Sequence, residues 1–337
     1  MKKILLEYLC CPECGGDFNV DNDSDEIESG TITCQKNSKH TFEIRGYIPR
    51  FVSFTSKADG KKEKTASNFA YQWTRFNSGY ENDHVCFDQF LGPVSSEDFK
   101  GKVVLDAGCG MGRFANIASK YGAKIVIAVD LGESIEAARE YNKERPNVHT
   151  IQADIYNLPL KVKVELAYSL GVIHHLPNPQ KAYNNIIRFV KDSGICVVWV
   201  YGKEGNEWVE KYISPVRTKI TSRIPMAILY PFCVLIGFIL FLILKLIYLP
   251  INLLSPKVAL YLFYNNYFKH TMHETLKQNI QTVLDHLLPP FSFYISKEDL
   301  ERWVSESTTS VEVFKISALR GYSWTLKTKI SQKKYNI

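Results

Sequence analysis

The sequence predicts an α/β fold in which a doubly wound, mostly parallel sheet carries helices on both faces. The prediction rests on short β-branched and apolar runs that alternate with helical patterns, of which Arg113–Lys120 and Ser134–Glu144 are the clearest. Alternation of this kind is typical of parallel strands joined by crossover helices. The seven runs, which predict seven strands, are VVLD at 103–106, IVIAVD at 125–130, VHTIQ at 148–152, VELAYSLG at 164–171, ICVVWVY at 195–201, VEVFKI at 311–316 and SWTLKTKI at 323–330.

Shifts in composition divide the chain into four zones. Residues 1–55 are rich in cysteine, and a polar, lysine-rich linker, SKADGKKEKT, follows them. Residues 66–202 hold the alternating pattern. Residues 203–307 are helical and contain a long uncharged block, and residues 308–330 bring the last two strands of the sheet. We therefore expect a small N-terminal module, an α/β core, and a helical, apolar insertion before the final strands.

The overall composition is that of an ordinary globular protein. The 337 residues are 45% hydrophobic and 23% charged, which excludes disordered, collagen-like and coiled-coil classes. A net charge of +6 permits a nucleic-acid or anionic-membrane partner without requiring one. The start, MKKILLEYLCC, is basic, but Glu7 interrupts an apolar stretch already too short for a signal peptide, so we expect a cytoplasmic protein.

Four of the eight cysteines lie within the first 34 residues, which indicates a metal site in a reducing compartment. Cys11 and Cys14 have the CPxCGG spacing of a zinc knuckle, and Cys34 and His40 follow after nineteen intervening residues. Three thiolates and one imidazole form a closed tetrahedral site, so we expect these four residues to hold a structural zinc ion. Two alternatives remain: unligated buried cysteines beside a surface histidine, and Cys10 as the ligand in place of Cys11.

The run VVLDAGCGMGRF at 103–114 is the most informative stretch. A strand leads into a loop with glycines at every second position and then into a helix, whose N-terminus favours negative charge. Asp106 precedes the loop, and Asp130 lies eighteen residues beyond Gly112, where it can accept hydrogen bonds from ribose hydroxyls. An acidic residue beside the loop would repel a pyrophosphate, but it suits a cationic ligand. S-adenosylmethionine, which carries a sulfonium and an ammonium group, is such a ligand.

These runs, together with QADIYNLPL at 152–160 and SLGVIHHLPNPQKAY at 169–183, resemble a class I S-adenosylmethionine-dependent methyltransferase of the type 11-like group. The resemblance covers about residues 65–202 and implies a Rossmann-like fold. It departs from the family pattern at KDSG, 191–194, where a glycine pair usually precedes the fifth strand. The residues it assigns to the cofactor are Asp106, Ala107, Gly108, Gly110 and Gly112 for the methionine end, Asp130 and Leu131 for the ribose, Asp154 and Ile155 for the adenine, and Leu170 and Gly171 beside the sulfonium.

The N-terminal module has its own resemblance. The pattern CPECGG, followed by HTFEIRGYIPRF at 40–51, is similar to the zinc-ribbon module that precedes many bacterial methyltransferases. A zinc ribbon ahead of this core also resembles a known ribosomal-RNA methyltransferase arrangement. The module therefore leaves the class of acceptor open.

Methyl transfer mainly requires alignment and exclusion of water, although some oxygen nucleophiles also need a general base. His174 and His175 follow the fourth predicted strand of the core and are the best candidates for that base. The alternative is that the pair packs against the helix that follows. Upstream, NFAYQWTRF at 68–76 has aromatic residues at helical spacing. It predicts a helix over the cofactor site or, equally, an ordinary packing helix.

Residues 226–244 contain no charged side chain, and nineteen helical residues extend about 28 Å, close to the thickness of a bilayer core. If the last two strands complete the core sheet, both ends of the insertion lie on one side, which excludes a single crossing. Three arrangements remain: a re-entrant hairpin with its turn at Pro250, a helix in the plane of the membrane, and a helix buried in a dimer. Basic residues at the flanks favour an anionic cytoplasmic leaflet; these are Arg217, Lys219, Arg223, Lys245 and Lys257.

The sequence thus predicts a methyltransferase for a small-molecule or lipid acceptor, in contact with the membrane through residues 226–254. We expect it to be cytoplasmic, and peripheral or monotopic at the inner face of the membrane. An RNA methyltransferase is the alternative, supported by six basic residues against one acidic residue between positions 311 and 337, although nucleic acid gives no role to the apolar block. A non-catalytic adaptor is a third reading. The oligomeric state stays open.

Overall fold

A computed structural model describes residues 1–52, 59–75 and 82–331 of the chain. The chain forms two compact units. The sheet unit comprises Met1–Val200, Glu298–Ser317 and Thr325–Ile337, and the helical unit comprises Tyr201–Lys297 and Ala318–Trp324.

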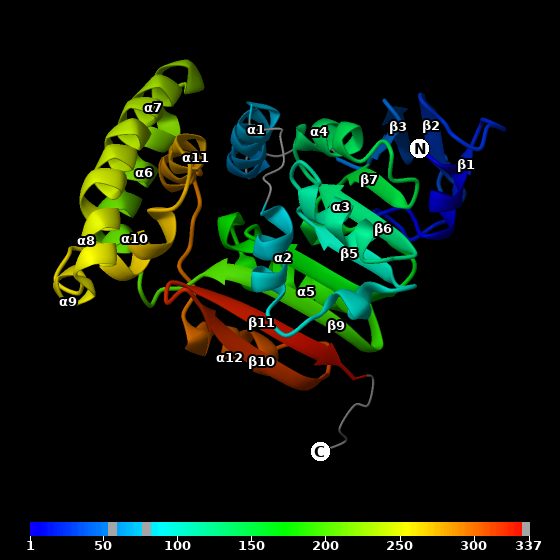
Figure 1. Ribbon diagram of the computed structural model, residues 1–337. Helices are drawn as coiled ribbons and strands as arrows, with labels where there is room; N and C mark the ends of the chain where they lie inside the picture. The colour runs from blue at the N-terminus through cyan, green and yellow to red at the C-terminus, as the bar shows by residue number, and fades with distance from the viewer. Residues whose placement is uncertain (53–58, 76–81, 332–337) are drawn as a thin grey trace. The chain divides into compact units, whose positions relative to one another are not determined.

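An eleven-stranded sheet runs through the sheet unit (Figure 1) in the order β1-β2-β3-β4-β7-β6-β5-β8-β9-β11-β10. The strands are β1 Phe18–Val20, β2 Gly30–Cys34, β3 Thr41–Arg45, β4 Ile48–Arg50, β5 Val103–Ala107, β6 Ile125–Asp130, β7 Val148–Gln152, β8 Val164–Leu170, β9 Val190–Tyr201, β10 Val311–Leu319 and β11 Ser323–Ile330.

The seven strands β5–β11 confirm the predicted Rossmann-like, mostly parallel sheet. β5 pairs in parallel with β6 and β8, β6 pairs with β7, and β8 pairs with β9. Residues 1–55, predicted as a zinc-ribbon module, contain the four strands β1–β4, which extend the same sheet because β4 pairs in parallel with β7 at Arg50 and Gln152. The domain boundaries drawn from the sequence stay a prediction.

Helices alternate with the strands of the sheet unit. Right-handed crossovers place α3 and α4 on one face and α5 on the other, because the strand order reverses between β5 and β8. The HHLPNP run begins α5: the Asn178 side chain accepts a hydrogen bond from the Lys181 N–H, and Pro179 occupies the first turn. The helices of this unit are α1 Asp59–Arg75, α2 Asp83–Leu91, α3 Arg113–Lys120, α4 Ser134–Tyr141, α5 Pro179–Arg188 and α12 Lys297–Ser305; the short 3-10 turns are η1 Lys3–Glu7, η2 Ser96–Phe99, η3 Ile155–Asn157 and η4 Ile173–His175.

The helical unit is built around two helices that pack side by side, α7 and α11 (Figure 1). Gly237 allows this approach, since a Cβ at that position would lie 2.8 Å from the Ile280 Cα. The buried Arg217 side chain donates hydrogen bonds to the carbonyls of His286 and Ser292, which ties the chain around α11. The helical segments are η5 Val209–Ile213, α6 Ser214–Lys219, η6 Thr221–Arg223, α7 Met226–Ile243, η7 Leu244–Tyr248, α8 Leu249–Leu254, α9 Pro256–Ala259, α10 Asn265–Thr271 and α11 Leu276–Leu287.

The apolar block is one continuous helix, Met226–Leu254, made of α7, η7 and α8. The re-entrant turn considered at Pro250 is wrong: Leu249 has helical dihedral angles, and Pro250 sits in the first turn of α8, where its missing N–H is tolerated. By length and composition alone, this helix could cross a membrane. Only 22% of its most apolar stretch is buried within the chain.

The helix buries one side and exposes the other. Leu244 and Tyr248 pack against Met272 in a small core of the helical unit. The exposed side chains are apolar, and their row continues beyond the helix end; they include Ile228, Phe232, Leu235, Ile239, Leu246, Leu253, Leu254, Val258, Leu260, Tyr261 and Phe263. The chain therefore leaves a long apolar surface without cover among its described residues.

Candidate functional site

The residues assigned to the cofactor gather at one edge of the sheet. β5, β6, β7 and β8 are neighbours, and their parallel registers align Asp106 with Ala128 and Tyr168, and Asp130 with Gln152. All predicted cofactor residues lie at the carboxyl ends of these four strands or directly after them. The strand order reverses between β5 and β8, and this reversal is where open α/β sheets bind ligands.

The loop after β5 has a backbone that favours glycine at every second position. Gly108, Gly110 and Gly112 have φ angles of +89°, +54° and +76°. A Cβ on Gly108 would lie 2.4 Å from Val172 Cγ1, and one on Gly112 would lie 2.6 Å from Asn142 Nδ2. The predicted loop is therefore a tight turn that larger side chains would obstruct.

Asp130 closes β6 and holds the loop in place. Its Oδ2 accepts a hydrogen bond from the Gly110 N–H at 2.8 Å. Its Oδ1 accepts from the Gly132 N–H at 2.9 Å and from the Ser134 hydroxyl at 2.8 Å. Since a carboxylate offers about four acceptor positions, Asp130 retains capacity for a hydroxyl donor such as a ribose. Ser134 was missed by the sequence analysis, although it begins the helix after the strand.

Asp106, near the end of β5, is a buried acid. Only 2% of the residue is exposed, and its Oδ2 accepts a hydrogen bond from the Tyr168 hydroxyl at 3.1 Å. Burial raises the pKa of this carboxyl to about 8, and the nearby Asp130 contributes to the rise. None of the groups that shift this pKa is basic. A buried carboxyl of this kind fits a cationic ligand, which would supply the missing positive charge.

The other predicted cofactor residues lie along the same edge. Asp154 caps η3 and accepts a hydrogen bond from the Tyr156 N–H at 3.0 Å. The carbonyl of Ile155 accepts from the Asn185 side chain. At Gly171, φ is +78°, and a Cβ would lie 3.3 Å from the Trp199 ring, so the chain turns tightly after Leu170.

His174 and His175 lie in η4, directly after this turn. Both are buried, with 0% and 4% of each residue exposed, and their ring centroids are 4.2 Å apart. His175 also packs against Phe69 of α1, with centroids 5.0 Å apart. His174 lies farther inside, with its centroid 6.3 Å from that of Trp199. His175 is thus the member of the pair that faces the helix α1.

α1 lies against two of the loops that form the site. A Cβ on Gly132, in the loop after β6, would lie 2.8 Å from the Ala66 carbonyl oxygen, so helix and loop are in close contact. On the other side, Phe69 meets His175 after β8. The helix predicted around NFAYQWTRF therefore spans the loops of β6 and β8; Phe76 lies outside the described residues.

The four predicted metal ligands come together in the N-terminal module. The donor atoms of Cys11, Cys14, Cys34 and His40 all lie within 4.8 Å of one another. Cys11 Sγ is 3.4 Å from His40 Nδ1, and Cys14 Sγ is 3.4 Å from Cys34 Sγ, close to the about 3.8 Å expected between sulfurs on tetrahedral zinc. A Cβ on Gly16 would lie 2.7 Å from Cys34 Sγ. The cluster contains Cys11, whereas Cys10 is not part of it.

A series of side-chain interactions, which the sequence analysis missed, links the N-terminal module to the cofactor loops. Arg50 of β4 is 6% exposed, and it donates a hydrogen bond to Gln152 Oε1 at 2.6 Å and pairs with Glu136. Gln152 Nε2 donates in turn to the Leu131 carbonyl at 3.0 Å, beside Asp130. In the sequence, Arg50 is visible as the arginine of the GYIPRF run. Its partner Gln152 becomes evident only from the pairing of β4 with β7.

Comparisons with known proteins identify matches to methyltransferases. Residues 105–198 match the protein family described as a methyltransferase domain. The chain is 41% identical over 81 residues to a ribosomal protein L11 methyltransferase of Cupriavidus pinatubonensis and 33% identical over 98 residues to a ubiquinone biosynthesis O-methyltransferase of Coxiella burnetii. It is 29% identical over 103 residues to a tRNA U34 carboxymethyltransferase of Ruthia magnifica. These alignments cover 24%, 28% and 29% of the chain but only 26%, 42% and 32% of the respective relatives.

Solved structures of similar outline include magnesium protoporphyrin IX methyltransferase from Synechocystis PCC 6803, with 13% identity over 82% of this chain and 100% of that chain, at a TM-score of 0.47. The DhpI complex with SAH has 12% identity over 83% of this chain and 100% of that chain, at a TM-score of 0.49. The family match confirms the resemblance of the glycine loop and of the HHLPNP run: residues 105–198 form a methyltransferase domain.

Proposed function

We propose that this chain, which carries a methyltransferase domain at residues 105–198, transfers a methyl group from S-adenosylmethionine to a small-molecule or lipid acceptor at a membrane surface. The cofactor half of the proposal is supported by the buried Asp106 beside the glycine loop. The acceptor half depends on one observation above all: the helix Met226–Leu254 exposes an apolar face that no described part of the chain covers.

The bound cofactor would supply an electrophilic methyl group on a sulfonium. Asp106 would compensate the positive charge of the cofactor, with Ala107 and the loop glycines close to its methionine end. Asp130, held by Gly110, Gly132 and Ser134, would accept hydrogen bonds from the ribose, with Leu131 beside it. Asp154 and Ile155 would lie toward the adenine, and Leu170 and Gly171 would line the reacting end.

His175 is the preferred general base of the pair, because it lies at the contact with α1 while His174 packs deeper against Trp199. In this role His175 would take a proton from the acceptor, and α1 would limit the access of water. Replacement by glutamine tests the role: a His175→Gln variant should lose kcat and the acidic limb of the pH–rate profile while retaining cofactor affinity. If His174→Gln loses as much kcat as His175→Gln, and neither variant changes the shape of the pH–rate profile, the pair serves in packing.

We propose zinc as the ion of the N-terminal cluster. Cys11, Cys14, Cys34 and His40 would fill all four positions of a tetrahedral ion, so the ion would act in folding. The Asn37 side chain lies 3.0 Å from His40 Nε2 and would orient the ring for coordination through Nδ1.

The acceptor is tested directly with methyl-labelled S-adenosylmethionine. The purified protein is incubated with a membrane lipid extract, with quinone precursors and with total RNA, and label is followed into each fraction. Label in an organic-soluble product supports the proposal. Label confined to RNA, or absence of cofactor binding by the well-folded protein, would refute it.

RNA is the second candidate acceptor, and one observation favours it. A pocket of about 160 Å³ in the sheet unit is lined by Lys2, Arg139, Lys143 and Arg145 among others. Two of these charges are already compensated, since Arg139 pairs with Glu26 and Lys143 pairs with Glu140. We therefore place RNA second; salt-sensitive binding of total RNA would reverse the order.

We propose a cytoplasmic location, with the protein peripheral or monotopic at the inner face of the membrane. Lys219, Arg223 and Lys257 flank the apolar segment and would meet an anionic leaflet. Membranes washed first with high salt and then with detergent test this location. Release by detergent alone supports it, and a fully soluble protein contradicts it.

A further inference from the structure

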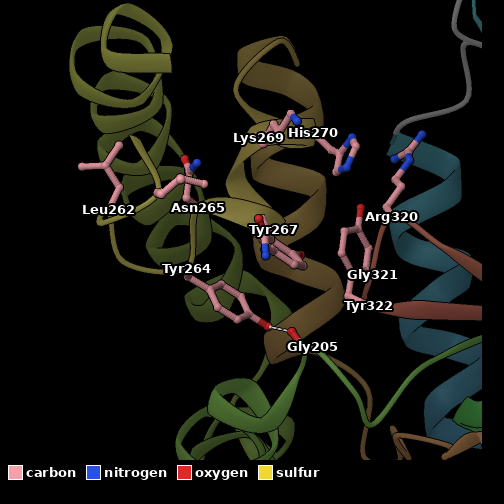
Figure 2. Close-up of a pocket in the computed structure, with 12 residues that line it drawn as sticks. Gly205, Leu262, Tyr264, Asn265, Tyr267, Lys269, His270, Arg320, Gly321 and Tyr322 are labelled. Atoms are coloured by element: carbon pink, nitrogen blue, oxygen red, sulfur yellow. Dashed lines mark hydrogen bonds between the residues drawn. The ribbon is translucent and has the colours of Figure 1, made fainter. Parts of the chain in front are cut away.

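The helical unit contains a pocket of about 470 Å³ that the methyltransferase domain does not use (Figure 2). It lies within the helical unit alone, formed by the segment around α10 and by the turn between β10 and β11. Its lining residues are Gly205, Leu260, Leu262, Tyr264, Asn265, Asn266, Tyr267, Lys269, His270, Arg320, Gly321 and Tyr322.

The titratable side chains that give this lining its charge are basic. Figure 2 shows the basic side chains of Lys269, His270 and Arg320 gathered at one end of the pocket. The described residues that line it include no acidic side chain. The pKa of His270 is lowered by burial and by the charges of Arg320, Lys269 and His273, so the basic groups act on one another. The arrangement favours an anion.

Two acidic residues lie in the neighbourhood but outside the lining. Partial burial raises the pKa of Glu274 to about 7, while Arg320 and Lys245 act in the opposite direction. Glu207 accepts a hydrogen bond from the Gly205 N–H at 3.1 Å. Glu207 contacts Gly205, away from the basic end, whereas Glu274 acts on Arg320 and offsets part of its charge when it is ionised. Lys269 and His270 add to the basic character of that end.

The opposite end is a built floor. The Tyr264 hydroxyl donates a hydrogen bond to the Gly205 carbonyl (Figure 2). The Tyr264 hydroxyl also lies 3.4 Å from Asn206 Oδ1, and the Asn206 side chain donates to the carbonyls of Gly202 and Tyr322 at 2.8 and 2.7 Å. The rings of Tyr267 and Tyr322 form a wall, with centroids 4.8 Å apart. A floor and a wall of this kind give the pocket a defined shape.

The backbone of the pocket is also strained at two positions. Tyr264 and Arg320 have φ angles of +55° and +56°, in the left-handed region that residues other than glycine rarely adopt. Such strain gathers at binding sites, where surrounding structure maintains it. Here it directs one aromatic ring and one guanidinium to the same pocket.

The rim of the pocket connects with the apolar surface. Leu260 is 76% exposed and belongs to both the lining and the row of apolar side chains that extends from the long helix. An occupant with an anionic head and an apolar tail would contact both regions. A soluble anion would use only the basic end.

We propose that this pocket binds the phosphate-bearing headgroup of an anionic lipid. Lys269, His270 and Arg320 contact the phosphate, the tyrosine wall contacts the glycerol portion, and the acyl chains leave past Leu260. The inference rests on the membrane contact proposed above and adds a specific headgroup site to it.

Vesicle sedimentation separates the two proposals. Vesicles of phosphatidylcholine alone measure the contact through the apolar face. Added phosphatidylglycerol measures the headgroup site as an increase in affinity. If phosphatidylcholine vesicles do not bind, the apolar contact fails, whereas the phosphatidylglycerol-dependent increase still tests the pocket.

Lys269→Met and Arg320→Gln should each reduce the phosphatidylglycerol-dependent increase by roughly 10- to 100-fold, as expected for a lost charged hydrogen bond. Lys257→Met and Arg223→Gln are the matched controls, because they remove the same charges from exposed positions of the helical unit. In each control, the phosphatidylglycerol-dependent increase in affinity should fall by no more than about fivefold. This is the effect of removing one basic side chain that lies near an anionic surface without a specific contact. Equal losses in pocket and control variants would overturn the proposal.

Two further measurements cover the cases in which a variant fails to fold or the ligand is a soluble phosphate. The pKa of His270, followed by NMR in the unmodified protein, should rise when phosphatidylglycerol is added, and no rise would overturn the proposal even if the variants fail to fold. Inorganic phosphate is titrated without vesicles. Saturable phosphate binding that Lys269→Met abolishes, together with equal lipid losses in all four variants, would assign the pocket to a soluble phosphate and overturn the lipid.

Discussion

β6 and the helix Met226–Leu254 are both strongly apolar, but the fold treats them differently. Five of the six residues in β6 are buried, whereas only 22% of the most apolar stretch of the helix is buried. The strand lies between two other strands of a parallel sheet and is covered by helices. The helix packs one side against α11 and leaves the other exposed. An apolar run therefore indicates burial, but it does not say whether the chain itself provides the cover.

Two leucines on the long helix offer the largest expected effects. Leu244 is 0% exposed and Leu246 is 70% exposed, only two residues apart. Leu244→Gln should lower the free energy of unfolding by about 3 to 5 kcal/mol, because it replaces apolar contacts by a buried amide without a hydrogen-bond partner. Leu246→Gln should leave stability within about 0.5 kcal/mol and weaken binding to phosphatidylcholine vesicles by about tenfold. Denaturant titration and vesicle sedimentation measure the two effects.

A different result would replace the membrane by a second copy of the chain. If Leu246→Gln destabilises the protein as much as Leu244→Gln does, and sedimentation velocity shows a dimer becoming a monomer, the exposed face is a subunit interface. That outcome would remove the main support for a lipid acceptor.

The glycine loop provides the next comparison, on the side of the buried strands. Gly108→Ala would place a Cβ 2.4 Å from Val172 and should weaken S-adenosylmethionine binding by about 100-fold, as measured by calorimetry. Gly101→Ala is the matched control, since Gly101 has φ +71° with no atom within 4 Å of its added Cβ. The control should cost about 1 kcal/mol of stability with cofactor binding intact. Equal loss of binding in both variants would show that backbone strain, rather than the close approach, controls the site.

Asp106 makes cofactor binding depend on pH. Its pKa is raised to about 8 by burial, so below that pH the carboxyl is protonated in the folded, ligand-free protein. A cationic ligand favours the ionised form, and binding must therefore release a proton. Affinity should rise by up to about tenfold for each pH unit from pH 6 to 8 and then level off. Asp106→Asn should bind weakly with a flat profile; a steep profile in that variant would assign the proton to another group.

The same group affects stability with a definite sign. A carboxyl whose pKa is higher in the folded state favours folding below the pKa of the unfolded chain, and this contribution is lost as the pH rises through about 8. The ligand-free protein should therefore become less stable between pH 4 and 8 through this group. Thermal melts of the wild type and of Asp106→Asn isolate the contribution.

Arg50 carries the smallest expected effect, and it connects the metal module with the cofactor loops. Arg50→Met should weaken cofactor binding by about fivefold, because Gln152 would no longer be held beside Leu131. Arg45→Met, an exposed position in the neighbouring strand, is the control and should have no effect. Zinc content should stay unchanged in both variants. Unchanged affinity in Arg50→Met would show that the module acts independently of the site.

Much of the α/β core was predictable because its signals are local. The predicted strand at 125–130 matches β6, and the predicted helix Arg113–Lys120 matches α3. The glycine loop could be placed because its spacing is sufficient to define a tight turn. The Cys11–His40 cluster could be predicted for the same reason, since metal ligands occur at characteristic spacings.

The remaining features depend on contacts between distant residues. Nothing in the run GYIPRF shows that Arg50 meets Gln152, about a hundred residues later. The pocket of the helical unit needs Arg320 to meet the segment around Tyr264, and the turn that brings it there has a left-handed residue that no sequence rule indicates. Pro250 gave a misleading signal, because proline is compatible with the first turn of a helix as well as with a break.

The pairing of β4 with β7 also determines how the sheet ends. Because the N-terminal strands continue beyond β7, the outermost strand on that side is β1, which has only three residues and offers few unpaired backbone groups to another chain. A shortened protein that lacked the N-terminal module would instead end in Val148–Gln152, a strand whose five residues are all buried in the intact protein. An exposed strand edge of this kind can pair with another chain and promote aggregation. The N-terminal module therefore protects the edge of the sheet, whatever it contributes to recognition.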